Sequence, residues 1–300
     1  MNNLDQSILK TVCYFDLFDY PLTLLEIRKW LWQNPEKNLN LIEHSLNNNP
    51  NIASKQGFYF LKDREKLVEL RKQRYINSQL KFKKRLKFIK ILTYLPFVEG
   101  IFIANNLAVS NVKDDSDIDL IIVAKKNIWT TRLFTTTKIA ALGLRPTPQK
   151  SKDKICLSVY LTHNHLNLEK YKINRQDIHY TYWADQIIPI YDKNNIYKKY
   201  REANHWIKTD LPNSLAYQVA KPRKIDNNVW KDISQNIFGL LSFEKFYKKI
   251  QLKKLPLKLK NLMNKDNRVV INDEILKFHD NDPREEIQKN WETKYNNLIT

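Results

Sequence analysis

The chain has 300 residues, and 42% of them are apolar, which allows about two or three domains with buried cores. Its 51 Lys and Arg residues outnumber its 32 Asp and Glu residues. The resulting net charge of +19 favours an anionic partner, either nucleic acid or a nucleotide, unless it only reflects a compositional preference for lysine. No run of about 18 apolar residues occurs, so we expect no membrane-spanning helix. The first residues, MNNLDQSILK, lack the basic and apolar segments of a signal peptide, so we expect a cytoplasmic protein.

Residues 1–63 carry the pattern of a winged-helix-like module. Apolar residues at helical spacing predict helices over residues 5–15 and Leu39–Leu46, and the Thr23–Glu26 capping box begins another helix between them. The segment IASKQGFYFLK then predicts two short strands joined at Gln56-Gly57. Three helices and a hairpin are the order found in winged helices, which bind DNA through the third helix or contact other proteins. The third helix contains no Lys or Arg here, which weakens the case for DNA binding by this module.

A strongly basic helix is expected over residues 64–94 and connects this module to the next domain. Twelve Lys and Arg residues, but only three acidic residues, lie between Lys62 and Lys90. The first interpretation is an amphipathic connector with a solvated face. The alternative is a stripe that binds the phosphates of nucleic acid, formed by Lys81, Lys83, Lys84, Arg85 and Lys87.

The stretch SNVKDDSDIDLIIVAKK, residues 110–126, places aspartates directly before and inside an apolar run. Its DIDLIIV segment reads as a strand, in which Asp117 and Asp119 point to one side while Ile118 points into the core. Two such carboxylates repel each other unless a cation lies between them. Mg²⁺ or Mn²⁺, with substrate phosphates and water, meets this need and suits phosphoryl or nucleotidyl transfer. A charged loop that ends at the strand is the alternative, but it explains Asp119 poorly.

The segment SDIDLIIV, preceded by a strand and a turn, resembles the signature of the DNA polymerase beta-type nucleotidyltransferase superfamily. The landmarks FDYPLT, PFVEGIFIANNLAVSN, WTTR and DKICLSVYLT are similar to those of bacterial proteins of this superfamily that begin with a winged-helix-like region. The resemblance implies an α+β fold with a small mixed sheet, in which Asp117 and Asp119 bind metal and support catalysis. It also implies that a turn before the pair holds the phosphates of a nucleoside triphosphate, and that a third carboxylate often lies on a later strand.

Two parts of this family pattern are altered in the chain. The Gly-Ser pair of the family's turn corresponds to Asn105-Asn106, where Asn tolerates a positive φ but its side chain crowds a phosphate. The strand expected to carry the third carboxylate, Lys154–Thr162, has Ser158 at its centre and no acid. The residues expected to bind the nucleotide are Asn105, Asn106, Ser116 and Arg132.

A nucleotidyltransferase-like domain is expected over residues 95–192, followed by a mostly helical region over residues 193–300. Aromatic residues expected in the core of the helical region are Trp206, Trp230, Phe238, Phe243, Phe246 and Tyr247. Cys13 and Cys156 lie far apart in apolar context, so we expect buried free thiols. The function expected from these features is Mg²⁺-dependent transfer of a nucleoside monophosphate from a nucleoside triphosphate to an acceptor. The alternative is a catalytically degenerate protein of the same fold that binds nucleic acid or another protein.

Overall fold

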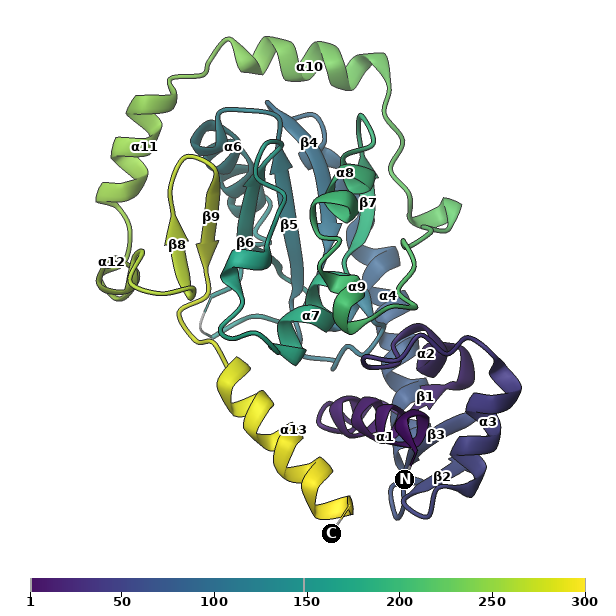
Figure 1. Ribbon diagram of the computed structural model, residues 1–300. Helices are drawn as coiled ribbons and strands as arrows, with labels where there is room; N and C mark the ends of the chain where they lie inside the picture. The colour runs from purple at the N-terminus through teal and green to yellow at the C-terminus, as the bar shows by residue number, and fades with distance from the viewer. Residues whose placement is uncertain (1, 148, 300) are drawn as a thin grey trace.

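The computed structural model describes residues 2–147 and 149–299, and residues 2–61 form a small unit of helices and strands (Figure 1). The Thr23–Glu26 capping box is present, because the Thr23 hydroxyl accepts a hydrogen bond from the Glu26 N–H while the Glu26 carboxylate accepts one from the Thr23 N–H. Gln56 and Gly57 have φ values of 55° and 79°, the left-handed backbone that a two-residue hairpin turn requires. The elements are α1 (Asn3–Asp16), β1 (Leu22–Thr23), α2 (Leu24–Lys29), α3 (Leu39–Asn48), β2 (Ile52–Lys55) and β3 (Phe58–Leu61). The three expected helices and the hairpin are confirmed, and β1 adds a third strand beside β3.

The long helix α4 (Leu67–Leu92) connects this unit to the central sheet and carries a buried lysine. Lys81 is only 4% exposed, and its Nζ donates to the carboxylate of Asp153 at 2.8 Å. The same Nζ donates to the backbone carbonyl oxygens of Asp114 at 2.8 Å and Ser116 at 2.9 Å. One side chain of α4 therefore holds the two loops that precede neighbouring strands of the sheet.

Six strands form a mixed sheet in the order β7-β4-β5-β6-β9-β8. They are β4 (Val98–Ile103), β5 (Ile118–Ala124), β6 (Ile155–Thr162), β7 (Ile188–Asp192), β8 (Val269–Ile271) and β9 (Ile275–Phe278). β5 and β6 are parallel and are joined through α6 (Ile128–Ala141), whereas the other neighbouring strands are antiparallel. The expected α+β class with a mixed sheet is confirmed. The expected boundary at residue 192 does not isolate a separate C-terminal region, because β8 and β9 extend the same sheet.

The remaining helices are distributed around this sheet (Figure 1). They are α5 (Asn105–Ala108), α7 (Ile178–Asp185), α8 (Ile196–Ala203), α9 (Ile207–Asp210), α10 (Val229–Gly239), α11 (Glu244–Lys253), α12 (Leu257–Leu262) and α13 (Arg284–Ile299), with short 3-10 helices at Glu169–Tyr171 and Lys221–Arg223. α13 returns to the N-terminal unit, where the Trp291 indole N–H donates to the carbonyl of Lys10 at 2.9 Å. In the part of the chain that the structure describes, none of the helices combines the length and apolar character needed to span a membrane.

The two faces of the sheet are buried against different helices. One face, which includes Ile101 and Leu120, shares an apolar cluster with α6 and the second half of α4. The opposite face, which includes Phe102 and Ile121, shares a cluster with α7, α8 and α1. Because side chains alternate along a strand, Asp119 belongs to the same face as Ile121. The acidic pair therefore lies on the side of the sheet that continues into the N-terminal unit.

The helices α10 and α11 lie at the periphery of the molecule (Figure 1) and are attached through polar side chains. Gln235 of α10 donates to the carbonyl oxygens of Thr93 and Val98, both at 2.8 Å. Gln251 of α11 donates to the carbonyl of Trp129 at 2.8 Å. Of the aromatic residues expected in the core, Trp206 is buried and Tyr247 is partly buried against the core, but exposure ranges from 39% to 72% for Trp230, Phe238, Phe243 and Phe246. Those four expectations are wrong because the polar faces of α10 and α11 turn inward.

The anchoring role of Lys81 can be tested by unfolding. We expect Lys81→Met to lower the free energy of unfolding by about 3 kcal/mol, because Asp153 loses a buried partner and two carbonyls lose a donor. Lys83→Met, on the exposed side of the same helix, should change it by less than about 0.5 kcal/mol. Urea unfolding at pH 7 measures both values. If Lys81→Met has the same free energy of unfolding as the wild type, Lys81 does not anchor the two loops.

The pair of Lys81 with Asp153 also makes the free energy of unfolding depend on pH. Burial raises the pKa of Asp153, but hydrogen bonds from Lys81 and Lys84 outweigh this effect and lower the pKa to about 2. The stabilising contribution of this carboxylate is therefore present above about pH 4 and is lost as the pH falls toward 2. The difference in unfolding free energy between wild type and Lys81→Met should narrow over that interval.

Candidate functional site

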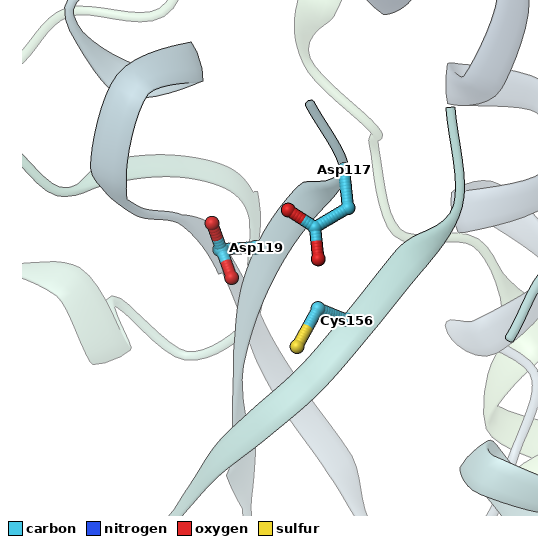
Figure 2. A group of neighbouring side chains, drawn as sticks. All are labelled: Asp117, Asp119 and Cys156. Carbon is cyan, nitrogen blue, oxygen red and sulfur yellow. The ribbon is translucent and has the colours of Figure 1, made fainter. Parts of the chain in front are cut away.

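Two aspartates and a cysteine meet where β5 and β6 begin (Figure 2). Asp117 directly precedes β5, Asp119 is the second residue of β5, and Cys156 is the second residue of β6. One oxygen of each carboxylate and the Cys156 Sγ all lie within 4.8 Å of one another. The three side chains are partly exposed and point toward one another (Figure 2). The structure therefore brings the two predicted aspartates together, although β5 begins at Ile118 and not at Asp117.

The charged forms of both carboxylates are disfavoured. Burial raises the pKa of Asp117, against the opposite effects of a hydrogen bond from its own backbone N–H and of the charge on Lys81. Burial and the charge of Asp117 raise the pKa of Asp119 to about 7, although the Asn105 amide and the Cys156 thiol both hydrogen-bond to Asp119. Near neutral pH, the pair is therefore stabilised by an added proton or cation.

Cys156 is the member of this cluster that the sequence reasoning missed. In the parallel register, the partner of Asp119 is Cys156, so the residue of β6 that lies beside the acidic pair is Cys156 and not Ser158. β6 contains one additional residue just after this pair, so counting residues along the strand does not identify the partners in the register. A signal was available, because Ile118 and Ile155 begin the two apolar runs and are partners in the register. Aligning these two residues places Cys156 beside Asp119.

The Cys156 thiol is a neutral group in this site. Burial raises its pKa to about 12, and the charges of Asp119 and Asp117 act in the same direction. Cys156 is therefore protonated at neutral pH and serves as a hydrogen-bond donor to Asp119. Cys13 and Cys156 are both free thiols, as expected, but only Cys13 is fully buried.

The turn expected to hold phosphates lies beside Asp119. Asn105 begins the short helix α5 with a φ of 56°, a left-handed backbone that Gly or Asn adopts most readily. Its Oδ1 accepts a hydrogen bond from the Trp183 indole N–H at 2.9 Å. Asn106 is exposed, and its carbonyl accepts a hydrogen bond from the Asn111 N–H at 2.8 Å. The side chain of Asn105 is therefore engaged between Trp183 and Asp119.

A cavity of about 370 Å³ opens beside Asp119 and includes both residues of the Asn105-Asn106 turn. Its walls come from α1, from α7 and from the segment between β9 and α13. The side chains that distinguish it are Phe18, His179, Tyr180, Trp183, Lys277 and Arg284. Burial lowers the pKa of His179 to about 4 and that of Lys277 to about 8. Such a volume with largely aromatic walls is typical of small-ligand sites.

Ser116 and Arg132, both expected at the nucleotide site, lie in different surroundings. The Ser116 carbonyl accepts the hydrogen bond from Lys81, so this residue helps to fix the loop before β5. Arg132 of α6 is not part of the lining beside Asp119. Its Nη1 donates to Oε1 of Gln251 at 2.6 Å, and it lines a second cavity. The structure therefore separates Arg132 from the other expected nucleotide-binding residues.

The five basic residues expected to form one nucleic-acid-binding stripe on α4 do not share a surface. Lys81 is buried against Asp153, and the carboxylate of Asp153 also lies 2.5 Å from Lys84 Nζ and 3.8 Å from Arg85 Nη2. A single acid from outside the helix thus engages three of the five cations. A separate groove contains the other two, and its basic residues are Lys83, Lys87, Lys90, Arg223 and Lys224.

Comparisons of the chain with models of protein families, with curated proteins and with solved structures give no match. Function is therefore inferred from the donor groups of the site. Asp117 and Asp119 offer hard oxygen ligands, and Lys81, whose Nζ is bound to Asp153, offsets their repulsion only in part. A protonated thiol is a poor ligand for a hard cation, which leaves two carboxylates. Mg²⁺ or Mn²⁺ takes one or two carboxylates together with water and substrate phosphates, so the donor set fits these ions.

The strain within the pair predicts a stabilising substitution. Because the pKa of Asp119 is raised from 3.8 to about 7 in the folded state, its contribution to stability is present below about pH 4 and is lost as the pH rises through 7. We expect Asp119→Asn to raise the free energy of unfolding by roughly 1–3 kcal/mol at pH 8 without divalent cations, and by less at pH 5. Saturating Mg²⁺ should reduce the difference in unfolding free energy between Asp119→Asn and the wild type. Only the wild type retains both carboxylates, so the bound cation should stabilise it more.

Urea unfolding at the two pH values, with and without Mg²⁺, measures these effects. Asp115→Asn is the matched control, since Asp115 is exposed in the same loop and its substitution should have no effect. A wild type as stable as Asp119→Asn at pH 8 would show that the pair is not strained.

Proposed function

We propose that the protein is a metal-dependent nucleotidyltransferase of the DNA polymerase beta type, which moves a nucleoside monophosphate from a nucleoside triphosphate to an acceptor. The observation that carries the proposal is the placement of Asp117 and Asp119 side by side at the start of a central strand. The cavity of about 370 Å³ next to Asp119 supports it, because a nucleotide has space there beside the turn at Asn105.

The roles of the site residues follow from their contacts. Asp117 and Asp119 would hold Mg²⁺ or Mn²⁺, which supplies charge neutralisation at the phosphates during transfer. Lys81 fixes the carbonyl of Ser116 and thereby the position of the adjacent Asp117. Hydrogen bonds from the Asn105 amide and from the thiol of β6 orient the Asp119 carboxylate. The chain thus contributes positioning, which is the main requirement of this class of reaction.

The nucleobase is proposed to bind between α7 and the N-terminal unit. The rings of Tyr180 and Trp183 are stacked with centroids 5.3 Å apart, and those of Phe18 and His179 are stacked at 5.6 Å. Aromatic faces bind bases of different identity by stacking. The N-terminal unit, which we interpret as winged-helix-like, would then serve as a wall of the nucleotide site. Its third helix, α3, has the sequence LNLIEHSLNN and offers no cation to nucleic acid.

Nucleotide turnover tests this proposal. Purified protein with each labelled nucleoside triphosphate, Mg²⁺ and a mixed pool of RNA, DNA and protein acceptors should release pyrophosphate and transfer label. The Asp117→Asn, Asp119→Asn double variant should lose at least about a hundredfold in rate while unfolding cooperatively, because both hard ligands are removed. Equal turnover by the wild type and the double variant would exclude this pair as the catalytic centre.

A catalytically degenerate protein of the same fold is the second candidate, and two observations favour it. Cys156 occupies the position at which the superfamily often has a third carboxylate. The side chain of Asn105 is bonded to Trp183 at the turn where the superfamily has glycine. A degenerate protein of this kind would bind nucleic acid or another protein. The basic groove that includes Lys83 and Lys87 is the surface available for a polyanion.

Restoring an acid at the third position separates the two candidates. We expect Cys156→Asp to raise the affinity for Mn²⁺ about tenfold and to lower stability in metal-free buffer, since a third carboxylate adds both a ligand and repulsion. Calorimetric titration with Mn²⁺ and urea unfolding measure the two effects, with Cys156→Ser as the control of similar size. If Cys156→Asp turns over nucleotide faster than the wild type and also binds Mn²⁺ more tightly, the result would support the interpretation of the protein as a weakened enzyme. An unchanged Mn²⁺ affinity would place position 156 outside any metal site.

A further inference from the structure

A second cavity, of about 560 Å³, lies on the other side of Cys156 and has a strongly one-sided charge. It is formed by α6, by α11 and α12, and by the first residues of β6. β6 pairs with β9 only over Val159–Leu161, so its edge at residues 155–158 borders the cavity. Three basic residues line it, Arg132, Arg145 and Lys254, and the lining contains no acidic residue. The remaining lining is mainly aliphatic.

The arginine at the centre of this cavity lacks an anionic partner. Arg132 contacts Gln251 through Nη1 and lies over the Phe278 ring, 4.5 Å from its centroid. Its Nε is buried and, within residues 2–147 and 149–299, has no hydrogen-bond acceptor. Burial lowers the pKa of Arg132, and the nearby charge of Arg145 lowers it further. Arg132 and Arg145 line the same cavity, and no carboxylate is part of its lining.

Three other arginines with little exposure are paired with a carboxylate. A carboxylate lies within 3.0 Å of each of the largely buried residues Arg71, Arg201 and Arg284. Arg132 has no such partner. Burying an unpaired charge is energetically unfavourable, so this arginine is destabilising in the protein alone. An anionic ligand between Arg132, Arg145 and Lys254 would supply the missing charge. Arginine pairs favour phosphate, which accepts two parallel hydrogen bonds from a guanidinium, and a total charge of about +3 suits a phosphate dianion.

We propose that this cavity binds a small phosphomonoester whose remainder is apolar apart from a hydroxyl group, and that this molecule is the acceptor of the nucleotidyl transfer. The acceptor role rests on the proposed function, whereas the anion site does not. The cavity reaches Cys156, whose Sγ lies within 4.8 Å of the carboxylate oxygens of Asp117 and Asp119. This cavity lies on the α6 side of the sheet, whereas Asp119 lies on the opposite side. A molecule anchored by its phosphate at Arg132 would therefore reach the carboxylate pair around the edge of β6 at residues 155–158, past Cys156.

The chemical step transfers one nucleotidyl group. A hydroxyl oxygen of the acceptor forms a bond to the α-phosphorus of the nucleoside triphosphate. The bond from that phosphorus to the bridging oxygen breaks, pyrophosphate leaves with the electron pair, and the hydroxyl proton passes to solvent. The phosphate of the acceptor takes no part in bond making and serves only as an anchor.

Binding of phenyl phosphate tests the anion site directly. Calorimetry in buffer without nucleotide or divalent metal should detect binding of phenyl phosphate to the wild type, and binding of phenol at least about tenfold weaker. Arg132→Gln and Arg145→Gln should each weaken phenyl phosphate binding about tenfold. Arg145 is exposed, so Arg145→Gln keeps the test valid if Arg132→Gln disturbs the fold. Arg175→Gln, at an exposed arginine far from the lining, should bind like the wild type.

The outcomes separate the site from the reaction. Equal affinity of the wild type and both cavity variants overturns the anion site. Displacement of phenyl phosphate by ATP assigns the cavity to the nucleotide and overturns the acceptor role. Phenyl phosphate binding that depends on Arg145, in a protein that binds no nucleoside triphosphate, supports the anion site while the proposed function fails.

Discussion

The buried ion pair between Lys81 and Asp153 is the interaction on which the arrangement of the site depends. It joins α4 to the loop before β6, and the same ammonium group binds carbonyl oxygens of the loop before β5. Both loops lead directly into the strands that carry Asp117 and Cys156. Since β5 and β6 are parallel, fixing their starting points fixes which side chains become neighbours. A helix that sequence alone presents as a connector is therefore part of the framework of the site.

Many buried charges in residues 2–147 and 149–299 meet opposite charges, as in the pairs of Lys81 with Asp153 and of Arg284 with Asp177. Two places near the start of β6 contain charge that is not compensated in this way. The unpaired places are the carboxylate pair and the surroundings of Arg132, which have opposite sign and share Cys156 as a boundary. Uncompensated charge in a cavity is destabilising for the protein alone, and ligands of opposite charge remove that cost. Under the functions proposed above, the carboxylate pair would bind a cation and the surroundings of Arg132 would bind an anion.

Periodicity along the chain predicts local features well and neighbours across the fold poorly. The alternation of DIDLIIV predicts that Asp117 and Asp119 share a face, because that relation is set within one strand. Cys156 escapes such reasoning, since its position beside Asp119 depends on the pairing of two strands and on an irregularity in one of them. The stripe on α4 fails for a similar reason, because Asp153 lies 72 residues beyond Lys81 in the chain. The aromatic residues of α10 and α11 were expected inside because a helix usually buries its apolar face, whereas here glutamines make the inward contacts.

The outward face of α10 and α11 has a consequence for behaviour in solution. Its apolar side chains are well exposed, including Trp230 at 72%, Leu240 at 82% and Phe243 at 60%. Apolar surfaces of this kind associate with one another when molecules meet, and the net charge of +19 is what keeps two copies apart. Salt shortens the range of that repulsion to about 10 Å at 0.1 M and about 3 Å at 1 M, while leaving apolar attraction in place. Molecules of this protein should therefore stay dispersed in buffer of low ionic strength and self-associate through α10 and α11 as ionic strength rises. Proteins whose solubility increases with added salt show the opposite behaviour.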